Sequence, residues 1–99
     1  MDAPELRDNP ERSRYEALVD GTVAGYADYT KLHDLVVFPH TVVRDEYGGR
    51  GIASQLAQFA LDDVAATGGL KVVPVCSFFV GFIAKHPEYA GLVYGSSAT

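Results

Sequence analysis

The stretch GGRGIASQLAQFALDDVAAT, residues 48–67, decides the fold, because it joins a glycine-rich turn directly to a helical pattern. From Gly51 to Thr67 the apolar residues recur at the spacing of a helix with one buried face. Asp63 is the one polar residue within that face. Two glycines follow at positions 68 and 69, where they predict the end of the helix, since glycine accepts the left-handed conformation found there.

The glycine turn has the features of an anion-binding site. Glycines let the backbone approach a ligand without an intervening Cβ, and the free N–H groups at a helix start favour a phosphate or pyrophosphate. Arg50 adds a positive charge at the same place. A turn selected for its geometry alone is the alternative, and the glycines by themselves do not decide between the two.

Two common nucleotide-binding motifs do not fit this turn. A P-loop requires lysine and then serine or threonine after its last glycine, where this chain has Ile52 and Ala53. A dinucleotide-binding fingerprint requires a third glycine where this chain has Ser54, and it belongs to the first strand of its fold. Here three predicted strands precede the turn, or four if residues 40–43 form a strand of their own.

Short segments upstream of the turn predict strands. Arg14–Val19 and Thr22–Tyr29 alternate around an Asp-Gly pair, which is a strong hairpin signal. Leu35–Phe38 is an apolar strand that ends or bends at Pro39. His40–Val43 is its continuation or a neighbouring strand.

Downstream of the long helix, Lys71–Cys76 predicts a short buried strand, and Phe78–His86 predicts a second helix that Ser77 could cap. The predicted order is β-β-β-β-α-β-α. A strand, a long helix and another strand suggest a parallel pair, and the upstream hairpin suggests antiparallel neighbours. The fold class is therefore α/β, or α+β with a mixed sheet.

Length and composition narrow the function further. The 99 residues have room for one domain, expected at residues 14–99, after a polar leader at 1–13 that we expect to be flexible. The formal charge of −5 argues against nucleic acid and anionic membranes as partners. No apolar signal-peptide core is present, which leads us to expect a cytoplasmic protein, as a monomer or weak homodimer. The single cysteine provides neither a disulfide nor a thiolate set for a metal.

Residues 40–53 (HTVVRDEYGGRGIA) resemble the acyl-CoA-binding motif of the GNAT N-acetyltransferase superfamily, Gln/Arg-x-x-Gly-x-Gly/Ala after a bulged strand. Gly51 and Ala53 occupy its second and third defined positions, whereas Gly48 stands where the family prefers a long polar side chain. Further pieces resemble a short, single-domain branch of the superfamily over residues 14–94: Asp20-Gly21, Ala24-Gly25-Tyr26, His40-Thr41, Pro74-x-Cys76-x-Phe78 and His86-Pro87-Glu88-Tyr89.

The resemblance implies that the chain binds acetyl-CoA, with the thioester held where the strands His40–Val43 and Lys71–Cys76 splay apart. A backbone N–H near Val42 or Val43 would polarise the thioester carbonyl. The coenzyme-binding residues implied in this way are Val42, Val43, Gly48, Gly49, Arg50, Gly51, Ile52 and Ala53.

His40 and Cys76 are the candidate catalytic residues. Imidazole titrates near neutral pH, so His40 is the best candidate base, with a structural histidine at a strand bulge as the alternative. Cys76 would act as a nucleophile or as the proton donor to the leaving thiolate, with a buried core cysteine as the alternative. Phe82 stands where many relatives have a tyrosine acid, which leaves Tyr89 or Tyr94 for that role.

Three functions follow from these residues. The first is an acetyl-CoA-dependent N-acetyltransferase that acts on an unidentified amine. The second is a CoA-binding module without efficient catalysis, which the departures at Gly48 and Phe82 favour. The third is an acyl carrier that acylates itself at Cys76.

Overall fold

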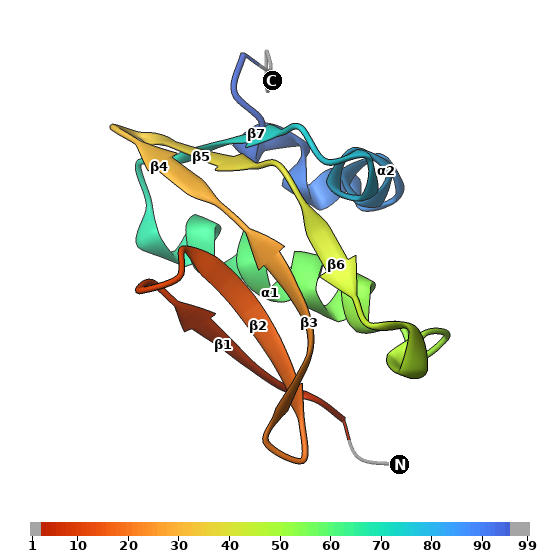
Figure 1. Ribbon diagram of the computed structural model, residues 1–99. Coiled ribbons are helices and arrows are strands. Elements are labelled where there is room, and N and C mark those ends of the chain that lie inside the picture. Colours follow the sequence, from red (N-terminus) through yellow and green to blue (C-terminus); the bar gives the residue numbers. More distant parts are fainter. Residues whose placement is uncertain (1–2, 96–99) are drawn as a thin grey trace.

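A computed structural model describes residues 3–95, which form two sheets and two α-helices (Figure 1). The first sheet is antiparallel, in the order β1 (Glu5–Asn9), β2 (Arg14–Val19), β3 (Thr22–Asp28) and β6 (Thr41–Val43). The second contains β4 (Thr30–Leu32), β5 (Leu35–Phe38) and β7 (Lys71–Pro74). Strand β5 pairs antiparallel with β4 and parallel with β7. The mixed α/β fold is thus confirmed.

The helical elements follow the predicted order. The short 3₁₀ helix η1 (Asp45–Tyr47) leads into the glycine turn and then into helix α1 (Ile52–Thr67). Helix α2 (Ser77–Lys85) comes directly after β7, and η2 (Pro87–Leu92) closes the described chain. No helix of the part described is long and apolar enough to cross a bilayer.

The expectation of a flexible leader at residues 1–13 is wrong for Glu5–Asn9, which form strand β1 along the edge of the first sheet. Five residue pairs, from Glu5 opposite Leu18 to Asn9 opposite Arg14, align β1 with β2. The polar side chains that suggested a leader have partners in the folded chain. Arg7 and Asn9 both bond to Glu16, so a strand of low hydrophobicity is held by polar contacts.

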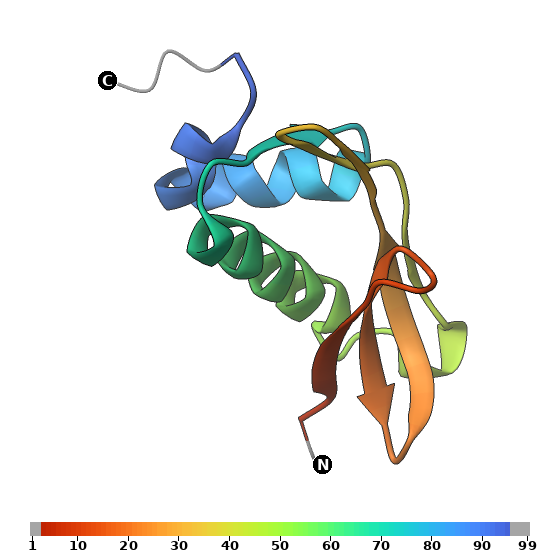
Figure 2. The same ribbon diagram turned by 90° about the vertical axis from the view of Figure 1, so that its left-hand side faces the viewer.

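The core lies between helix α1 and one face of the first sheet (Figure 2). The helix contributes its predicted apolar stripe: Ile52, Leu56, Ala57, Ala60, Leu61 and Val64 are buried. Small residues face it from β2 and β3, among them Ala17 and Ala24. Phe38 of β5 stacks on Phe79 of α2 with ring centroids 4.4 Å apart, which joins the second sheet to the second helix.

The opposite face of the first sheet carries no helix in the described chain, as Figure 2 shows. Side chains alternate between the two faces of a strand, so Tyr26 and Asp28 of β3 project to this outer face while Ala27 between them is buried. The outer face is therefore where the site described below is open.

Candidate functional site

The glycine turn has the backbone conformation that the sequence indicated. Gly49 and Gly51 have φ angles of +78° and +73°, in the left-handed region that side chains disfavour. A Cβ built on either residue meets no other atom within 4 Å. Glycine is therefore required here by the backbone conformation, and the space above the turn is open.

Helix α1 begins at this turn with unpartnered amides. Gly51 is its N-cap residue, the first turn contains no acidic residue, and no side chain among the described residues caps it. The first intrahelical bond runs from the Gln55 N–H to the Gly51 carbonyl at 3.1 Å, so the amides of Ile52, Ala53 and Ser54 have no acceptor within the helix. The guanidinium of Arg50 lies 5.1 Å from the centroid of the Tyr47 ring. These donors and this charge form an anion-binding site.

The chain changes its pairing partner between β5 and β6, at Pro39 and His40. The Phe38 carbonyl accepts hydrogen bonds from Val75 N–H (3.2 Å) and Cys76 N–H (2.8 Å), whereas the His40 carbonyl accepts from Asp28 N–H (2.9 Å). The chain therefore leaves β7 after Phe38 and joins β3 at His40. The parallel partner of Lys71–Pro74 is Leu35–Phe38, and the predicted pairing with His40–Val43 is wrong because that segment pairs with β3.

The pairing of β6 with β3 determines which way each backbone N–H of β6 points. Hydrogen-bonded pairs alternate along an antiparallel ladder, and the bonds at Asp28–His40 and at Arg44–Ala24 place Val42 opposite Tyr26 in another such pair. The Val42 N–H thus faces β3, and the Val43 N–H faces the opposite way, toward the side on which β7 diverges. Val43 supplies a backbone donor at the separation of the strands.

A cleft of about 630 Å³ opens at the separation. Its lining brings His40 and Cys76 together, as the sequence predicted, and includes Val42, which the resemblance assigned to coenzyme binding. It adds residues that the sequence had not singled out for the site: Tyr26, Asp28, Pro39, Thr41, Val75 and Ser77. The alternation of β3 could have placed Tyr26 and Asp28 on one face, but it could not show that this face borders the strand separation.

His40 is accessible in the cleft. Its side chain is 71% exposed, and its Nδ1 lies 3.8 Å from a carboxylate oxygen of Asp28. The imidazole is therefore open to a molecule entering from solvent, with an acidic group on the neighbouring strand.

Cys76 lies at the start of helix α2, because strand β7 ends at Pro74 and Cys76 occupies the N-cap position. Its Sγ is 3.4 Å from Thr41 Oγ1. Burial raises the pKa of the Cys76 thiol, but hydrogen bonds from Thr41 and from the amides of Phe79 and Phe78 outweigh it, so the pKa lies below its ordinary value. The thiol is half-buried and has enhanced thiolate character.

A second cavity of about 230 Å³ separates the first turn of α1 from α2. It is lined by Ser54, Ser77, Phe78, Gly81, Phe82, Lys85 and His86. Ser54 belongs to the anion-binding helix start and Ser77 also lines the cleft, so this cavity lies between the two. A further cavity of about 390 Å³, on the side of Ala3 and Val19, includes Arg50 but shares no lining residue with the cleft.

The tyrosines suggested as proton donors lie outside the cleft lining. The Tyr89 hydroxyl donates to Asp62 of α1 at 2.6 Å. Burial, and then this hydrogen bond, raise the pKa of Tyr89 to about 12. Tyr94 is 63% exposed near the end of the described chain. Phe82 stacks on His86 at a centroid distance of 4.1 Å and offers no hydroxyl.

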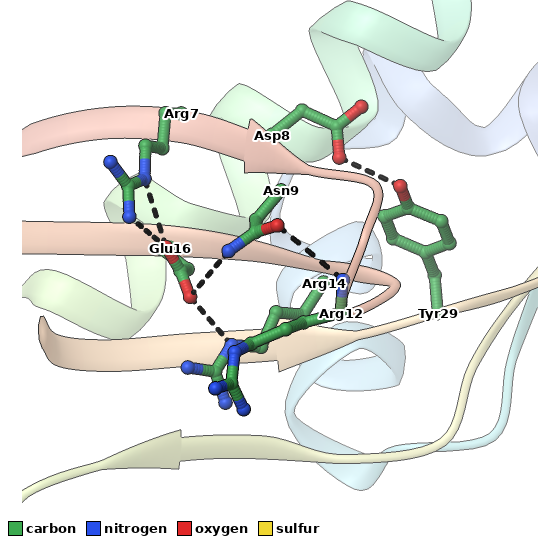
Figure 3. Close-up of polar contacts among 7 residues, drawn as sticks. All are labelled: Arg7, Asp8, Asn9, Arg12, Arg14, Glu16 and Tyr29. Atoms are coloured by element: carbon green, nitrogen blue, oxygen red, sulfur yellow. Dashed lines mark hydrogen bonds and ion pairs between the residues drawn. The ribbon is translucent and has the colours of Figure 1, made fainter.

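A polar cluster that the sequence did not reveal surrounds Glu16 of β2 (Figure 3). Glu16 is 1% exposed. Its Oε1 accepts from Arg7 Nε at 2.9 Å, and its Oε2 accepts from Asn9 at 3.2 Å and Arg14 Nε at 2.7 Å. Burial raises the pKa of Glu16, but these hydrogen bonds outweigh it and hold the pKa below its usual value. The Arg14 guanidinium then lies over the ring of Tyr26, 4.4 Å from its centroid.

Comparison with known proteins identifies the class. The sequence model of a family described as GCN5-related N-acetyl-transferase matches residues 14–92. The chain therefore belongs to the GCN5-related N-acetyltransferases. Its sequence matches no curated protein.

Solved structures agree with this assignment at the level of the fold. A GCN5-like putative N-acetyltransferase from Staphylococcus aureus superimposes with a TM-score of 0.71 at 20% identity, covering 99% of this chain and 95% of that one. The ribosomal-protein-S18-alanine N-acetyltransferase from Escherichia coli gives 0.64 at 14% identity, and 80% of this chain is covered. Ribosomal-protein-alanine N-acetyltransferase from Brucella melitensis biovar Abortus 2308 gives 0.56 at 19% identity, with 87% covered.

The match differs in extent among these structures. The chain spans 95% of the Staphylococcus protein, but only 54% and 66% of the Escherichia and Brucella enzymes. The short, single-domain architecture is thus found in another member of the same fold.

Proposed function

We propose that this protein is an acetyl-CoA-dependent N-acetyltransferase. The observation that carries the proposal is the continuity of three features: the cavity beside α2 shares Ser54 with the anion-binding start of α1 and Ser77 with the cleft at the strand separation. A coenzyme with a pyrophosphate at one end and a thioester at the other requires such an arrangement.

The glycine turn would hold the pyrophosphate. The amides of Ile52, Ala53 and Ser54 would donate to its oxygens, and Arg50 would contribute charge. Gly48, where the family has a long polar side chain, contributes backbone only. Lys85 lines the intermediate cavity and would offer a cation to the coenzyme's remaining phosphate.

The residues of the cleft would carry out the transfer. When bound, acetyl-CoA supplies an activated acetyl group as a thioester. Val43 N–H would donate to the thioester carbonyl oxygen, where negative charge develops. His40 would accept the proton that the amine loses as its nitrogen attacks the carbonyl carbon. Cys76 would donate its proton to the departing coenzyme thiolate.

Self-acylation is a second candidate function, and one observation favours it. The Cys76 thiol lines the cleft with a lowered pKa, as expected of a nucleophile. The thiolate would attack the thioester, releasing coenzyme A and leaving S-acetylcysteine. Intact mass after incubation with acetyl-CoA, compared between wild type and Cys76→Ala, distinguishes this route from direct transfer. A CoA-binding module is the third case, recognised by binding without coenzyme release across a panel of amines.

A charge at the start of α1 tests coenzyme binding without breaking the helix. Ser54 is exposed in the first turn, where a carboxylate favours the helix but opposes an anionic ligand. Ser54→Asp should weaken acetyl-CoA binding by about tenfold or more in calorimetry while leaving the melting temperature unchanged or higher. Ser54→Asn, of matched size and without charge, should bind as the wild type does. Equal binding of acetyl-CoA by both variants would show that the pyrophosphate does not bind at this helix start.

A further inference from the structure

Two rows of residues on strands β3 and β6 form the outer wall of the cleft. Asp28 faces His40, since the Asp28 N–H donates to the His40 carbonyl at 2.9 Å. Tyr26 faces Val42 one pleat further along the ladder. The first row is polar and adjoins the strand separation at Pro39, and the second row is apolar. Rows two residues apart on a strand are separated by about 6–7 Å.

The lining of the cleft, among residues 3–95, carries one carboxylate. Asp28 is the one Asp, Glu, Lys or Arg among the lining residues of the cleft in the described chain. Arg14 lies opposite Asp28 in the β2–β3 ladder and over the ring of Tyr26, and its charge is paired with Glu16. Arg44, two residues beyond Val42, lies 3.7 Å from Glu46. The cleft thus presents a carboxylate that is 35% exposed and has His40 as its charged-pair partner only when that imidazole is protonated.

The apolar part of the cleft is exposed to a degree that suggests an apolar ligand. Val75 is 61% exposed and Val42 is 39% exposed, and both line the cleft. They are two of only five large hydrophobic residues exposed in the described chain. Exposed apolar groups that gather around a cleft mark a binding surface.

We infer that Asp28 determines the specificity of the acceptor, and that the acceptor is a monocationic primary amine carrying an apolar body two or three carbons from the nitrogen, with no carboxylate beside the amine. The ammonium group would lie against Asp28 and His40, and its apolar body would reach the row of Tyr26 and Val42. An α-carboxylate would lie within about 4 Å of the Asp28 carboxylate and be repelled. Free amino acids are therefore excluded, and arylethylamines fit.

This inference rests on the proposed function only for the position of the reacting nitrogen. Binding of the acceptor amine can be measured without turnover, so the two can be tested separately. Amide chemical shifts would be followed while the wild type is titrated with 2-phenylethylamine, with phenylalanine and with the uncharged 2-phenylethanol. We expect the amine to shift Tyr26, Asp28, His40, Val42 and Val75 and to bind about five- to tenfold more tightly than either comparison compound.

Two variants sharpen the test. Asp28→Asn should bind 2-phenylethylamine and 2-phenylethanol equally, while Asp28→Glu should retain the preference for the amine. Equal binding of phenylalanine and the amine, unchanged amine binding by Asp28→Asn, or no shifts in the cleft would each overturn the inference. Acetyl-CoA calorimetry on the same samples reports separately on the proposed function, because Asp28 is absent from the glycine turn and from the cavity beside α2.

Discussion

The hydroxyl of Tyr15 on β2 donates a hydrogen bond of 2.8 Å to the carboxylate of Asp63 on α1, across 48 residues of chain. Two other tyrosine hydroxyls also donate to aspartate carboxylates. Tyr29 donates to Asp8 of β1 at 2.7 Å, and Tyr89 of η2 donates to Asp62 at 2.6 Å. These three bonds attach the edge strand, the main helix and the C-terminal 3₁₀ helix to the core.

The Tyr15–Asp63 bond should contribute measurably to stability. Tyr15→Phe retains the buried ring beside Tyr29 and Phe38 but removes the donor. The loss should be about 1–2 kcal/mol in the free energy of unfolding, measured by denaturant titration. In a double-mutant cycle with Asp63→Ala, which removes the acceptor, the two losses should be less than additive. Tyr94→Phe, at an exposed site, is the matched control and should change nothing. Additive losses would show that the bond carries no net energy.

The same tyrosines predict a loss of stability in alkali. Burial first, and then the bonded carboxylates, raise the pKa of Tyr15, Tyr29 and Tyr89, in the last case to about 12. The folded state therefore retains phenolic protons that the unfolded chain releases near pH 10. Stability from these groups is complete below that pH and falls as the pH rises toward 12 and beyond. Melting temperatures measured from pH 8 to 11.5 should decline above about pH 10. A steeper decline at pH 8–9 would point to other groups.

These bonds also explain which parts of the fold the sequence could predict. The apolar spacing predicted α1, and the Asp-Gly pair predicted the β2–β3 hairpin, because both depend on neighbouring residues. Asp63 interrupted the helical stripe without explanation, since its partner Tyr15 is distant in sequence. Strand β1 was missed for the same reason. Its residues are polar, and their partners become apparent only when β2 and β3 are folded against it.

The site was predictable to a similar extent. The glycine turn is local, so the pattern at Gly49 and Gly51 predicted its geometry. The cleft depends on three segments that meet in space, and the sequence identified His40 and Cys76 there but not Tyr26 or Asp28. The position at which residues 35–43 change their pairing partner from β7 to β3 decides which residues face the cleft. This position depends on pairing between strands that are distant in sequence.

Glu16 should be among the most costly polar residues to replace. Glu16→Gln removes the charge that holds Arg7 and Arg14 together, and we expect a loss of about 2–3 kcal/mol near neutral pH. Because the folded pKa of Glu16 is lowered, its contribution is present above the ordinary glutamate range and is lost as the pH falls through the folded value. Wild type and variant should therefore converge in stability in acid, below the ordinary glutamate range. Glu46→Gln, at an exposed pair 3.7 Å from Arg44, is the control and should cost less than about 0.5 kcal/mol. A constant gap at all pH values would contradict the assigned role of the charge.

His40 and Cys76 should affect turnover more than coenzyme binding. His40→Gln removes the base, so kcat/KM for an amine should fall about 10²–10⁴-fold. Cys76→Ser retains a small polar group in the cleft and should lower kcat to a lesser extent if the cysteine only donates a proton. Coenzyme release and calorimetric affinity for acetyl-CoA would be measured in parallel. Unchanged kcat/KM in His40→Gln would exclude that imidazole as the base.

Gly51 should be needed for coenzyme binding beyond its effect on stability. Gly51→Ala places a Cβ on a residue with φ of +73°, which costs about 1 kcal/mol, although the Cβ meets no atom within 4 Å. Gly21→Ala, at φ of +78° in the β2–β3 turn and equally free of contacts, is a matched control for that cost. Both variants should lose similar melting temperature, but only Gly51→Ala should lose affinity for acetyl-CoA, because relief of its strain would rotate the amides at the start of α1. Equal affinities in the two variants would show that the amides at the turn do not hold the coenzyme.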